Sequence, residues 1–364
     1  MSFCKLVVPM TIGERIKQGR KMVGLNQRQL AANVGVSAQA ISKYERDLDV
    51  PGSRVLIQLA KALNVRIEFF LRPRSITEIE PKFRRRQTLS AKGQDALLMQ
   101  VQDWLERYLE IEEILSQEIT EFECPNGFPR WVATYQEVEK AAEDLRHAWG
   151  LGDGPIENLT DLLEGKGIKV GAIDADAKFD ACTFQAKNGF TTTVIVTRTN
   201  IPGDRQRFSL AHELGHLVLK PVGLDEEKVS YRFAAAFLVP EIAARYELRG
   251  KRPTLSLYEL HILKHKYGLS MQAWVHRAHD LGIISVANEA AIFKIFSSHG
   301  WRKKEPGDEM EPELPRRFER MVMGAMADEV ISETRAGELL GQPVKTFLSN
   351  EAVQHGEWLA EVCS

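Results

Sequence analysis

The sequence is poor in cysteine, lacks a long apolar run and carries almost no net charge. Its four cysteines lie far apart and form no CxxC pair, which argues against a disulfide framework and against a cysteine-based zinc site. No apolar stretch is long enough to span a bilayer. The apolar patch in MSFCKLVVPM is followed at once by polar and basic residues, which argues against a signal peptide. We therefore expect a cytoplasmic protein with no membrane partner.

The small net charge of -2 conceals an asymmetry along the chain. The first 72 residues hold 12 Lys and Arg against 5 Asp and Glu, a net charge of +7, so the remainder carries -9. A basic end on an acidic body is expected when one domain meets a polyanion and the rest does not. A chain of 364 residues is also too long for one compact core, and its length predicts two or three domains.

Apolar residues recur with helical spacing from Ile12 to about Val65, and turn residues divide this stretch into short helices. Helices are expected at about Ile12–Val23, Gln27–Val34 and Ala38–Tyr44. Gly35 stands where a tight turn needs a left-handed residue, and Asn26 and Ser37 are suited to cap the second and third helices. Helix, short glycine turn, helix is the helix-turn-helix arrangement, which places its second helix in the DNA major groove.

The run QRQLAANVGVSAQAISKYERD resembles the Cro/repressor-type helix-turn-helix (XRE) family, from about residue 12 to residue 67. The resemblance implies a sequence-specific regulator that binds a double-stranded DNA operator as a homodimer. The residues expected at the DNA are Gln27, Ser37, Ala38, Gln39, Ser42 and Lys43. Gln39 can bond adenine through both N6 and N7, and Gln27 opens the helix that usually touches phosphates. Ala31, Val36 and Ile41 fit the core. The alternative is a helical bundle that contacts proteins.

A connector follows the basic region. Residues 73–90 contain two prolines and Arg84-Arg85-Arg86, and indicate a linker or a short extended segment. The arginine triplet is either solvated linker or an added phosphate contact. From Ala91 to about Glu121 helical periodicity returns, which predicts a packing or dimerisation helix.

The central region alternates short strand-like runs with helices. Strands are expected at Ile168–Ile173, Ala181–Ala186 and Thr192–Thr197, the last two joined by a hairpin at Lys187-Asn188-Gly189. Helices are expected at Val138–Trp149, Leu159–Glu164 and about Gly203–Leu219.

The helix at 203–219 contains His212-Glu213-Leu214-Gly215-His216. Two histidines four residues apart lie on one helical face, so both imidazoles can reach one metal ion. Glu213, next to the first histidine, is placed to take a proton from water as general base. The acids of DEEKVSYRFAAAFLVP then precede a strong helix and offer a third carboxylate ligand. The alternative is a satisfied histidine pair in a core helix.

RFSLAHELGHLVL and EKVSYRFAAAFLVP together resemble the ImmA/IrrE family of zinc metallopeptidase-like domains. The resemblance implies one Zn²⁺ per chain, ligands His212, His216 and Glu227 with Glu226 as the alternative, and Glu213 as general base. Tyr231 stands where the family often has Asn or Asp, so a contact that orients a ligand histidine is altered. Val229 stands where many members have a further Glu, and this departure bears on the choice of Glu227 as the third ligand. Candidate oxyanion stabilisers are His261, His265, His276 and Tyr231, each of which also fits an ordinary surface or core role.

The expected fold class is multidomain: an all-α repressor-like helix-turn-helix bundle, an α+β zincin-like metallopeptidase domain with a small sheet and the HExxH helix, and a helical C-terminal region. The expected domains are residues 1–72 (helix-turn-helix), 73–125 (linker and connector helix), 126–290 (metallopeptidase-like) and 291–364 (helical). Within 126–290, residues Leu255–Ile284 are expected to form two helices. Within the last region, Arg316–Asp328 and Ile331–Leu340 are expected to be helical, and Glu333–Phe347 resembles a small helix-turn-helix or packing module.

Three functions remain open at this point. The first is a bacterial-type regulator, associated with the nucleoid when bound to DNA, whose zinc domain cleaves a repressor-type protein or the chain itself. The second is a regulator whose zinc domain senses a ligand or partner without proteolysis, including an antitoxin-like repressor with a toxin partner. The third is a metallopeptidase whose helix-turn-helix docks proteins.

Overall fold

The computed structural model describes residues 10–72, 76, 78–81, 89–116, 121–187 and 189–355. Its backbone contacts divide the chain into two compact units. The first unit comprises Met1–Glu121, Phe184–Val194 and Pro315–Ser364, and the second comprises Phe122–Thr183 and Ile195–Leu314. Of the helices in these described ranges, none is long and apolar enough to cross a membrane.

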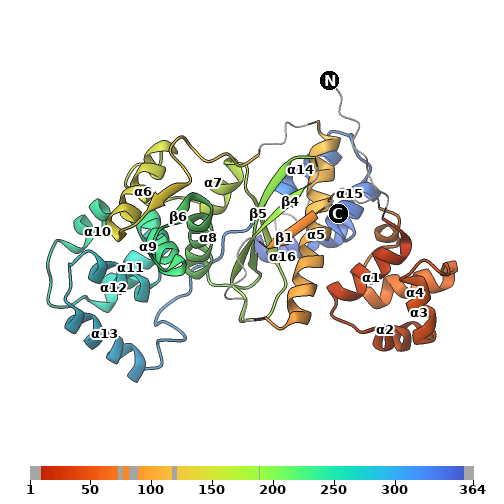
Figure 1. The fold of residues 1–364 in the computed structure, drawn as a ribbon, viewed down its shortest axis with the longest axis horizontal. Coiled ribbons are helices and arrows are strands. Elements are labelled where there is room, and N and C mark those ends of the chain that lie inside the picture. The colour runs from red at the N-terminus through yellow and green to blue at the C-terminus, as the bar shows by residue number, and fades with distance from the viewer. Residues whose placement is uncertain are drawn as a thin grey trace. The chain divides into compact units, whose positions relative to one another are not determined.

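The N-terminal part of the first unit is a bundle of short helices (Figure 1). Its elements are α1 (Ile12–Met22), α2 (Gln27–Val34), α3 (Ala38–Tyr44), α4 (Ser53–Leu63) and the 3₁₀ helix η1 (Ile67–Phe70). Asn26 and Ser37 cap α2 and α3 through their side chains, and Gly35 between them adopts a left-handed φ of 76°. The predicted helix, glycine turn and helix are therefore confirmed. The predicted core residues Ala31 and Ile41 are buried, and Val36 packs partly buried against them.

The remaining helices of the first unit are α5 (Ala91–Ile114), α14 (Arg317–Ala327), α15 (Glu333–Leu340) and α16 (Val344–His355). Helix α5 ends at Ile114, earlier than the sequence predicted, and residues 117–120 and Arg84-Arg85-Arg86 lie outside the described residues. Its apolar face is buried against α1, α14 and α15. An ion pair between Arg15 and Glu106, 2.7 Å long, is buried at the contact with α1. Helix α5 is thus a packing helix of its own unit.

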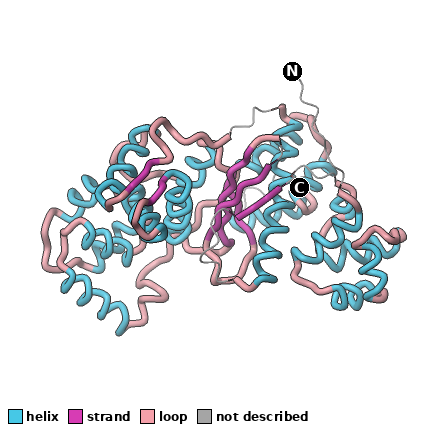
Figure 2. The backbone as a smooth tube through the Cα atoms, in the orientation of Figure 1, coloured by secondary structure: helices cyan, strands magenta, loops and turns pink. Residues whose placement is uncertain are grey.

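One four-stranded sheet has the order β1-β4-β5-β3 (Figure 2). Its strands are β1 (Glu78–Pro81), β3 (Lys169–Ile173), β4 (Ala181–Lys187) and β5 (Thr191–Arg198). Strands β3, β4 and β5 confirm the three predicted strands, and Asn188 of the predicted hairpin connection lies outside the described residues. Strand β1, in the segment predicted as linker or extended chain, pairs antiparallel with β4, from Glu78 opposite Lys187 to Pro81 opposite Phe184. A separate parallel pair joins β2 (Arg130–Val132) to β6 (Leu219–Pro221).

The second unit is mainly helical. Its helices are α6 (Tyr135–Ala148), α7 (Leu159–Gly165), α8 (Gly203–Val218), α9 (Glu226–Leu238), α10 (Glu241–Leu248), α11 (Leu257–Tyr267), α12 (Met271–Asp280) and α13 (Val286–Ser298). Helices α8 and α9 pack closely because Gly215 has no side chain. A Cβ there would lie 3.0 Å from Phe233 Cδ1 and 3.3 Å from Ser230 Cα. This close approach brings the HELGH face of α8 next to the first turns of α9.

Candidate metal centre

Helix α8 carries the first three residues of the candidate site. His212 and His216 lie one turn apart, and their Nε2 atoms are 3.1 Å from one another. Both Nε2 atoms therefore face the same point in space, as the i, i+4 spacing predicted. Burial first, and then the neighbouring His212, lower the pKa of His216 to about 4. At neutral pH His216 is consequently an uncharged imidazole with a lone pair available for a cation.

Helix α9 brings a carboxylate to these two nitrogens. Asp225 caps the helix by accepting a hydrogen bond from the Lys228 backbone N–H at 2.9 Å, which places Glu226 and Glu227 in the first turn. The Glu227 carboxylate lies 3.5 Å from His212 Nε2 and 3.8 Å from His216 Nε2. One donor atom from each of these three residues lies within 4.8 Å of the other two.

Glu226 occupies a different position from Glu227. Its carboxylate lies 3.4 Å from Nδ1 of His216, the nitrogen opposite Nε2, and half of its side chain is exposed. Ser230 Oγ is also 3.2 Å from this Nδ1. A hydrogen bond at Nδ1 fixes the histidine tautomer that leaves Nε2 free to bind a metal. The geometry therefore favours Glu227 as the third ligand and Glu226 as an outer partner of His216.

The cluster fits a zinc ion. Two imidazole nitrogens and one carboxylate oxygen are the donors of the two-histidine, one-glutamate zinc sites, in which a fourth position stays open to water or substrate. When the ring protons lie on Nδ1, the two Nε2 atoms and the Glu227 carboxylate present lone pairs to the same point, and a cation between them would be stabilised there. The residues His212, His216 and Glu227 are thus the ones that would hold zinc.

Glu213 lies deep beside this cluster. Its carboxylate accepts a hydrogen bond of 2.6 Å from the Thr183 hydroxyl on β4. Burial raises the pKa of Glu213, while the Thr183 hydrogen bond and nearby His212 oppose that rise. A buried carboxyl with a raised pKa is suited to exchange protons near neutral pH. From the sequence, Thr183 was expected only as part of the strand Ala181–Ala186. The feature that could have indicated a role for Thr183 is a hydroxyl in a strand whose neighbours, such as Phe184, are apolar and buried.

Tyr231 contacts His212 through its ring, not through a hydrogen bond to Nδ1. The two ring centres are 4.5 Å apart, and Tyr231 also stacks on Phe208. Nδ1 of His212 is buried and has no hydrogen-bond partner among the described residues. Among the other candidate oxyanion stabilisers, His276 binds Glu289 at 2.7 Å, and His261 packs against His265.

The helix-turn-helix residues divide into two groups. Gln39 and Lys43 are exposed on α3, with Ser42 half-buried beside them and Ala38 packed partly against the core. The others already make contacts inside the bundle. The Ser37 hydroxyl accepts the Ala40 N–H at 3.1 Å, and Gln27 donates to Glu45 at 2.8 Å. The exposed group can meet a ligand without rearrangement.

Two family models match this chain. Residues 16–70 match the helix-turn-helix model and residues 164–279 match the IrrE N-terminal-like domain. The chain carries both domains. The second match contains β3, β4, β5, α8 and α9, and therefore the whole His212, Glu213, His216 and Glu227 cluster.

The curated relatives are similar to the helix-turn-helix domain. An uncharacterised transcriptional regulator in the ATPase CF(0) region of Rhodospirillum rubrum is 42% identical over 59 residues, which are 16% of this chain and 55% of that protein. The regulator ImmR of Bacillus subtilis is 31% identical over 62 residues, 17% of this chain and 49% of its own length. Human endothelial differentiation-related factor 1 is 32% identical over 60 residues, 16% and 40% of the two chains. The chain thus spans about half the length of the curated relatives that it matches.

Proposed function

We propose that this protein is a sequence-specific DNA-binding transcriptional regulator whose IrrE-like domain is a zinc metallopeptidase that cleaves a repressor-type protein or the chain itself. The observation that carries the enzymatic part is the convergence of His212, His216 and Glu227 within 4.8 Å, with buried Glu213 beside them. A cluster built for packing alone does not need three acceptor groups facing one point.

The DNA-binding part is supported by the N-terminal domain. Gln39 and Lys43 are exposed on the second helix of the helix-turn-helix, and the first 72 residues carry a net charge of +7. This charge favours approach to phosphates, while an exposed glutamine amide can read a base edge. Two of the relatives similar to this domain are named as transcriptional regulators. The proposed partner is an operator duplex bound by a homodimer.

The catalytic part follows from the residues around Glu213. When bound, zinc would supply Lewis-acid polarisation of a peptide carbonyl. Glu213 takes a proton from the attacking water and returns it to the amide nitrogen that leaves when the C–N bond breaks. The Thr183 hydroxyl, 2.6 Å from the Glu213 carboxylate, holds this side chain in position. Water is consumed, and one peptide bond becomes a carboxylate and an amine.

The chain itself is one proposed target, cut in the connector 73–90. Within this connector, strand β1 (Glu78–Pro81) pairs with β4 from Glu78 opposite Lys187 to Pro81 opposite Phe184. Residues 82–88 of the connector lie outside the described residues. The test is intact-mass spectrometry after zinc loading and induction. An uncleaved connector would contradict self-cleavage and leave a separate repressor as the proposed target.

A second candidate function is a regulator whose zinc domain senses a ligand or a partner, such as a toxin, without proteolysis. It is favoured by the contact between Tyr231 and His212, in which Nδ1 of the histidine gains no hydrogen bond from a described residue. A ligand histidine without this support is less firmly oriented and less basic, and loss of such a contact lowers activity or metal affinity by about 10- to 100-fold.

One experiment separates these functions. The chain and its Glu213→Gln variant are purified without chelators, their zinc content is measured, and each is incubated with the repressor-type proteins of its host. Zinc in both, with cleavage only by the unmodified chain, supports the peptidase. Zinc in both without cleavage supports the sensor, and an absence of zinc overturns the metal centre.

A second measurement tests the DNA-binding part against a domain that docks proteins. Operator affinity is measured by fluorescence anisotropy between about 50 and 200 mM salt, where a protein with several phosphate contacts weakens steeply. Binding without salt dependence or sequence preference would favour a protein-docking domain.

A further inference from the structure

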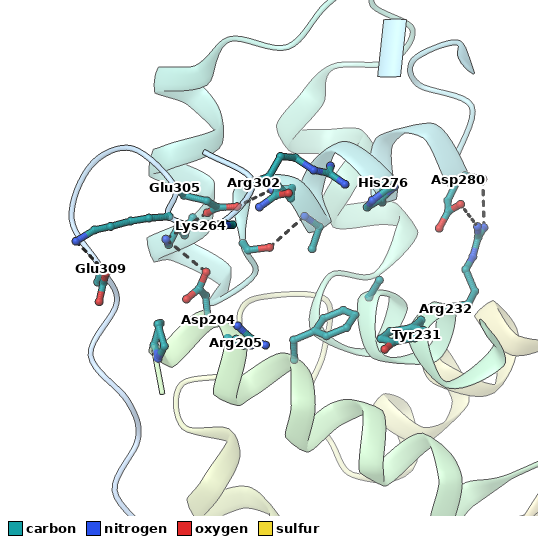
Figure 3. A pocket seen from close by; sticks show the side chains of 18 of the residues that line it. Asp204, Arg205, Tyr231, Arg232, Lys264, His276, Asp280, Arg302, Glu305 and Glu309 are labelled. Carbon is teal, nitrogen blue, oxygen red and sulfur yellow. Dashed lines mark hydrogen bonds and ion pairs between the residues drawn. The ribbon is translucent and has the colours of Figure 1, made fainter. Parts of the chain in front are cut away.

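A cavity of about 900 Å³ lies in the second unit beside the metal cluster. Helices α8, α9 and α12 and the segment 302–309 line it (Figure 3). In Figure 3, Tyr231 and Asp204 lie below, and Arg302 and His276 lie above. A volume of this size is in the range of small-molecule sites, about 300 to 1,000 Å³.

The first feature of the cavity is an aromatic wall. Phe208 of α8 and Tyr231 of α9 both line it, and their rings stack with centres 5.9 Å apart and planes 18° from parallel. Tyr231 is 44% exposed although it contacts His212 on the other side. A planar ligand ring can therefore pack on this pair in place of water. The Tyr231 ring thus lines the cavity and also contacts His212 of the metal cluster.

The second feature is a buried carboxylate without its full set of partners. Asp204 is 5% exposed and lies 3.4 Å from Lys264 Nζ through Oδ2. Its Oδ1 accepts no hydrogen bond within the described part of the chain. Lys264 also pairs with Glu305 at 3.3 Å, so the lysine charge is shared between two acids. Oδ1 is covered by its neighbours, so a ligand hydroxyl or amine would supply the missing donor after a small shift of the side chains at this wall, and an unmatched buried acceptor makes that favourable.

The third feature is an excess of positive charge. Lys304, Arg232 and Arg205 are each paired with an acid. The remaining cations Lys228, Arg302 and Lys303 form no ion pair with any described residue, although Arg302 lies over the Phe293 ring. Exposed lining cations without an ion pair favour an anionic ligand, since the described residues supply no carboxylate for them.

We propose that this cavity binds a nucleoside monophosphate. The ring would pack on Phe208 and Tyr231, a sugar hydroxyl or ring amine would donate to Asp204, and the phosphate would meet Arg302 and Lys303. A ring, a donor and an anion joined in one small molecule satisfy all three features of the cavity. An acidic segment of a protein would need a separate aromatic side chain to supply the ring, and inorganic phosphate lacks both the ring and the second donor.

The test is isothermal titration of the full-length protein with AMP, GMP, CMP and UMP, with adenosine and inorganic phosphate as partial ligands. We expect saturable binding of at least one monophosphate, at least about tenfold tighter than either fragment, because each fragment forfeits one set of contacts. Lys303→Glu and Arg302→Glu should each weaken it by about tenfold or more. Lys294→Glu makes the same change of charge at an exposed position outside the cavity, and should stay within about twofold.

Four results would overturn the proposal. One is an absence of saturable binding for all four monophosphates. Another is binding that Lys303→Glu and Arg302→Glu leave unchanged, which would place the nucleotide elsewhere, including the basic helix-turn-helix. The third is complete loss of binding when a chelator removes the metal, which would place the phosphate on the metal. Phosphate alone binding as tightly as AMP would likewise contradict a site built around a ring.

Discussion

The helix-turn-helix domain and the candidate metal cluster differ in how far their functional side chains are exposed to solvent. Gln39 and Lys43 lie on one short helix and point to solvent, where a large polyanion can reach them. The candidate metal cluster instead takes its ligands from α8 and α9, with Thr183 of β4 bonded to Glu213 beside them, and His216, Glu213 and Thr183 are buried. A surface that reads DNA needs exposed side chains on a rigid scaffold, whereas a metal centre needs donor atoms held together away from competing water.

Because of this difference, substitutions should affect the two sites in different ways. The proposed DNA-reading face depends on one helix and its cap, so damage to it should stay local. The metal cluster depends on how closely α8 and α9 approach, because its donors come from both helices. Changes at the α8–α9 contact should therefore disturb zinc binding even when they touch no ligand.

The largest effect on zinc affinity should come from replacing one of the two neighbouring acids of α9 by glutamine. Glu227→Gln should lower zinc affinity by more than about a hundredfold, because it removes a ligand charge. Glu226→Gln should cost less than about tenfold, since Glu226 lies at Nδ1 of His216. Competition with a zinc-binding dye measures both, and the reverse order would make Glu226 the ligand.

Gln39→Ala should reduce operator affinity by about 1–3 kcal/mol, because it removes both hydrogen bonds that the amide can make to adenine. Fluorescence anisotropy with an operator duplex and with an unrelated duplex measures the change. Affinity for the unrelated duplex should stay the same, since phosphate contacts carry no sequence information. Zinc content should also be unchanged. Equal losses on both duplexes would show that Gln39 does not read bases.

Gly215→Ala should destabilise the second unit by about 1–3 kcal/mol and weaken zinc binding, because the added methyl group forces α9 away from α8. Gly324→Ala is the matched control. Gly324 is an exposed position of α14 with no atom within 4 Å of an added Cβ, so alanine should stabilise α14 by up to about 1 kcal/mol. Thermal unfolding and zinc titration compare the two variants. Equal zinc affinity in the two variants would show that zinc binding does not depend on how closely α8 and α9 approach.

The smallest effect should be local to α3. Ser37→Ala should lower the free energy of opening of α3 by about 1 kcal/mol, because the Ala40 N–H loses its acceptor. Hydrogen exchange of peptides that cover α3 measures this. Ser37→Thr should restore most of the protection. Faster hydrogen exchange at α8 as well would show that the loss of the Ser37 cap is not confined to the helix-turn-helix.

Much of the architecture could be predicted because its signals are local. The caps at Asn26 and Ser37, the left-handed Gly35 and the period of apolar residues specify α2 and α3 within a few residues. The three central strands and the HELGH helix follow from similarly short patterns. The pair β2–β6 was missed because three-residue strands have no period to read, and the position of β1 was missed because pairing across more than 100 residues leaves no local trace.

The sequence by itself determined which groups are available: the i, i+4 histidines with Glu213 between them, two candidate acids on the next helix, and an exposed polar face on α3. Only the tertiary structure decided how they meet. It set Glu227 against the two Nε2 atoms and Glu226 against Nδ1, joined Thr183 to Glu213, and placed Tyr231 between the metal cluster and a charged cavity. The reason is physical, since helix geometry fixes neighbours within one turn, while side-chain packing fixes the distance and rotation between helices.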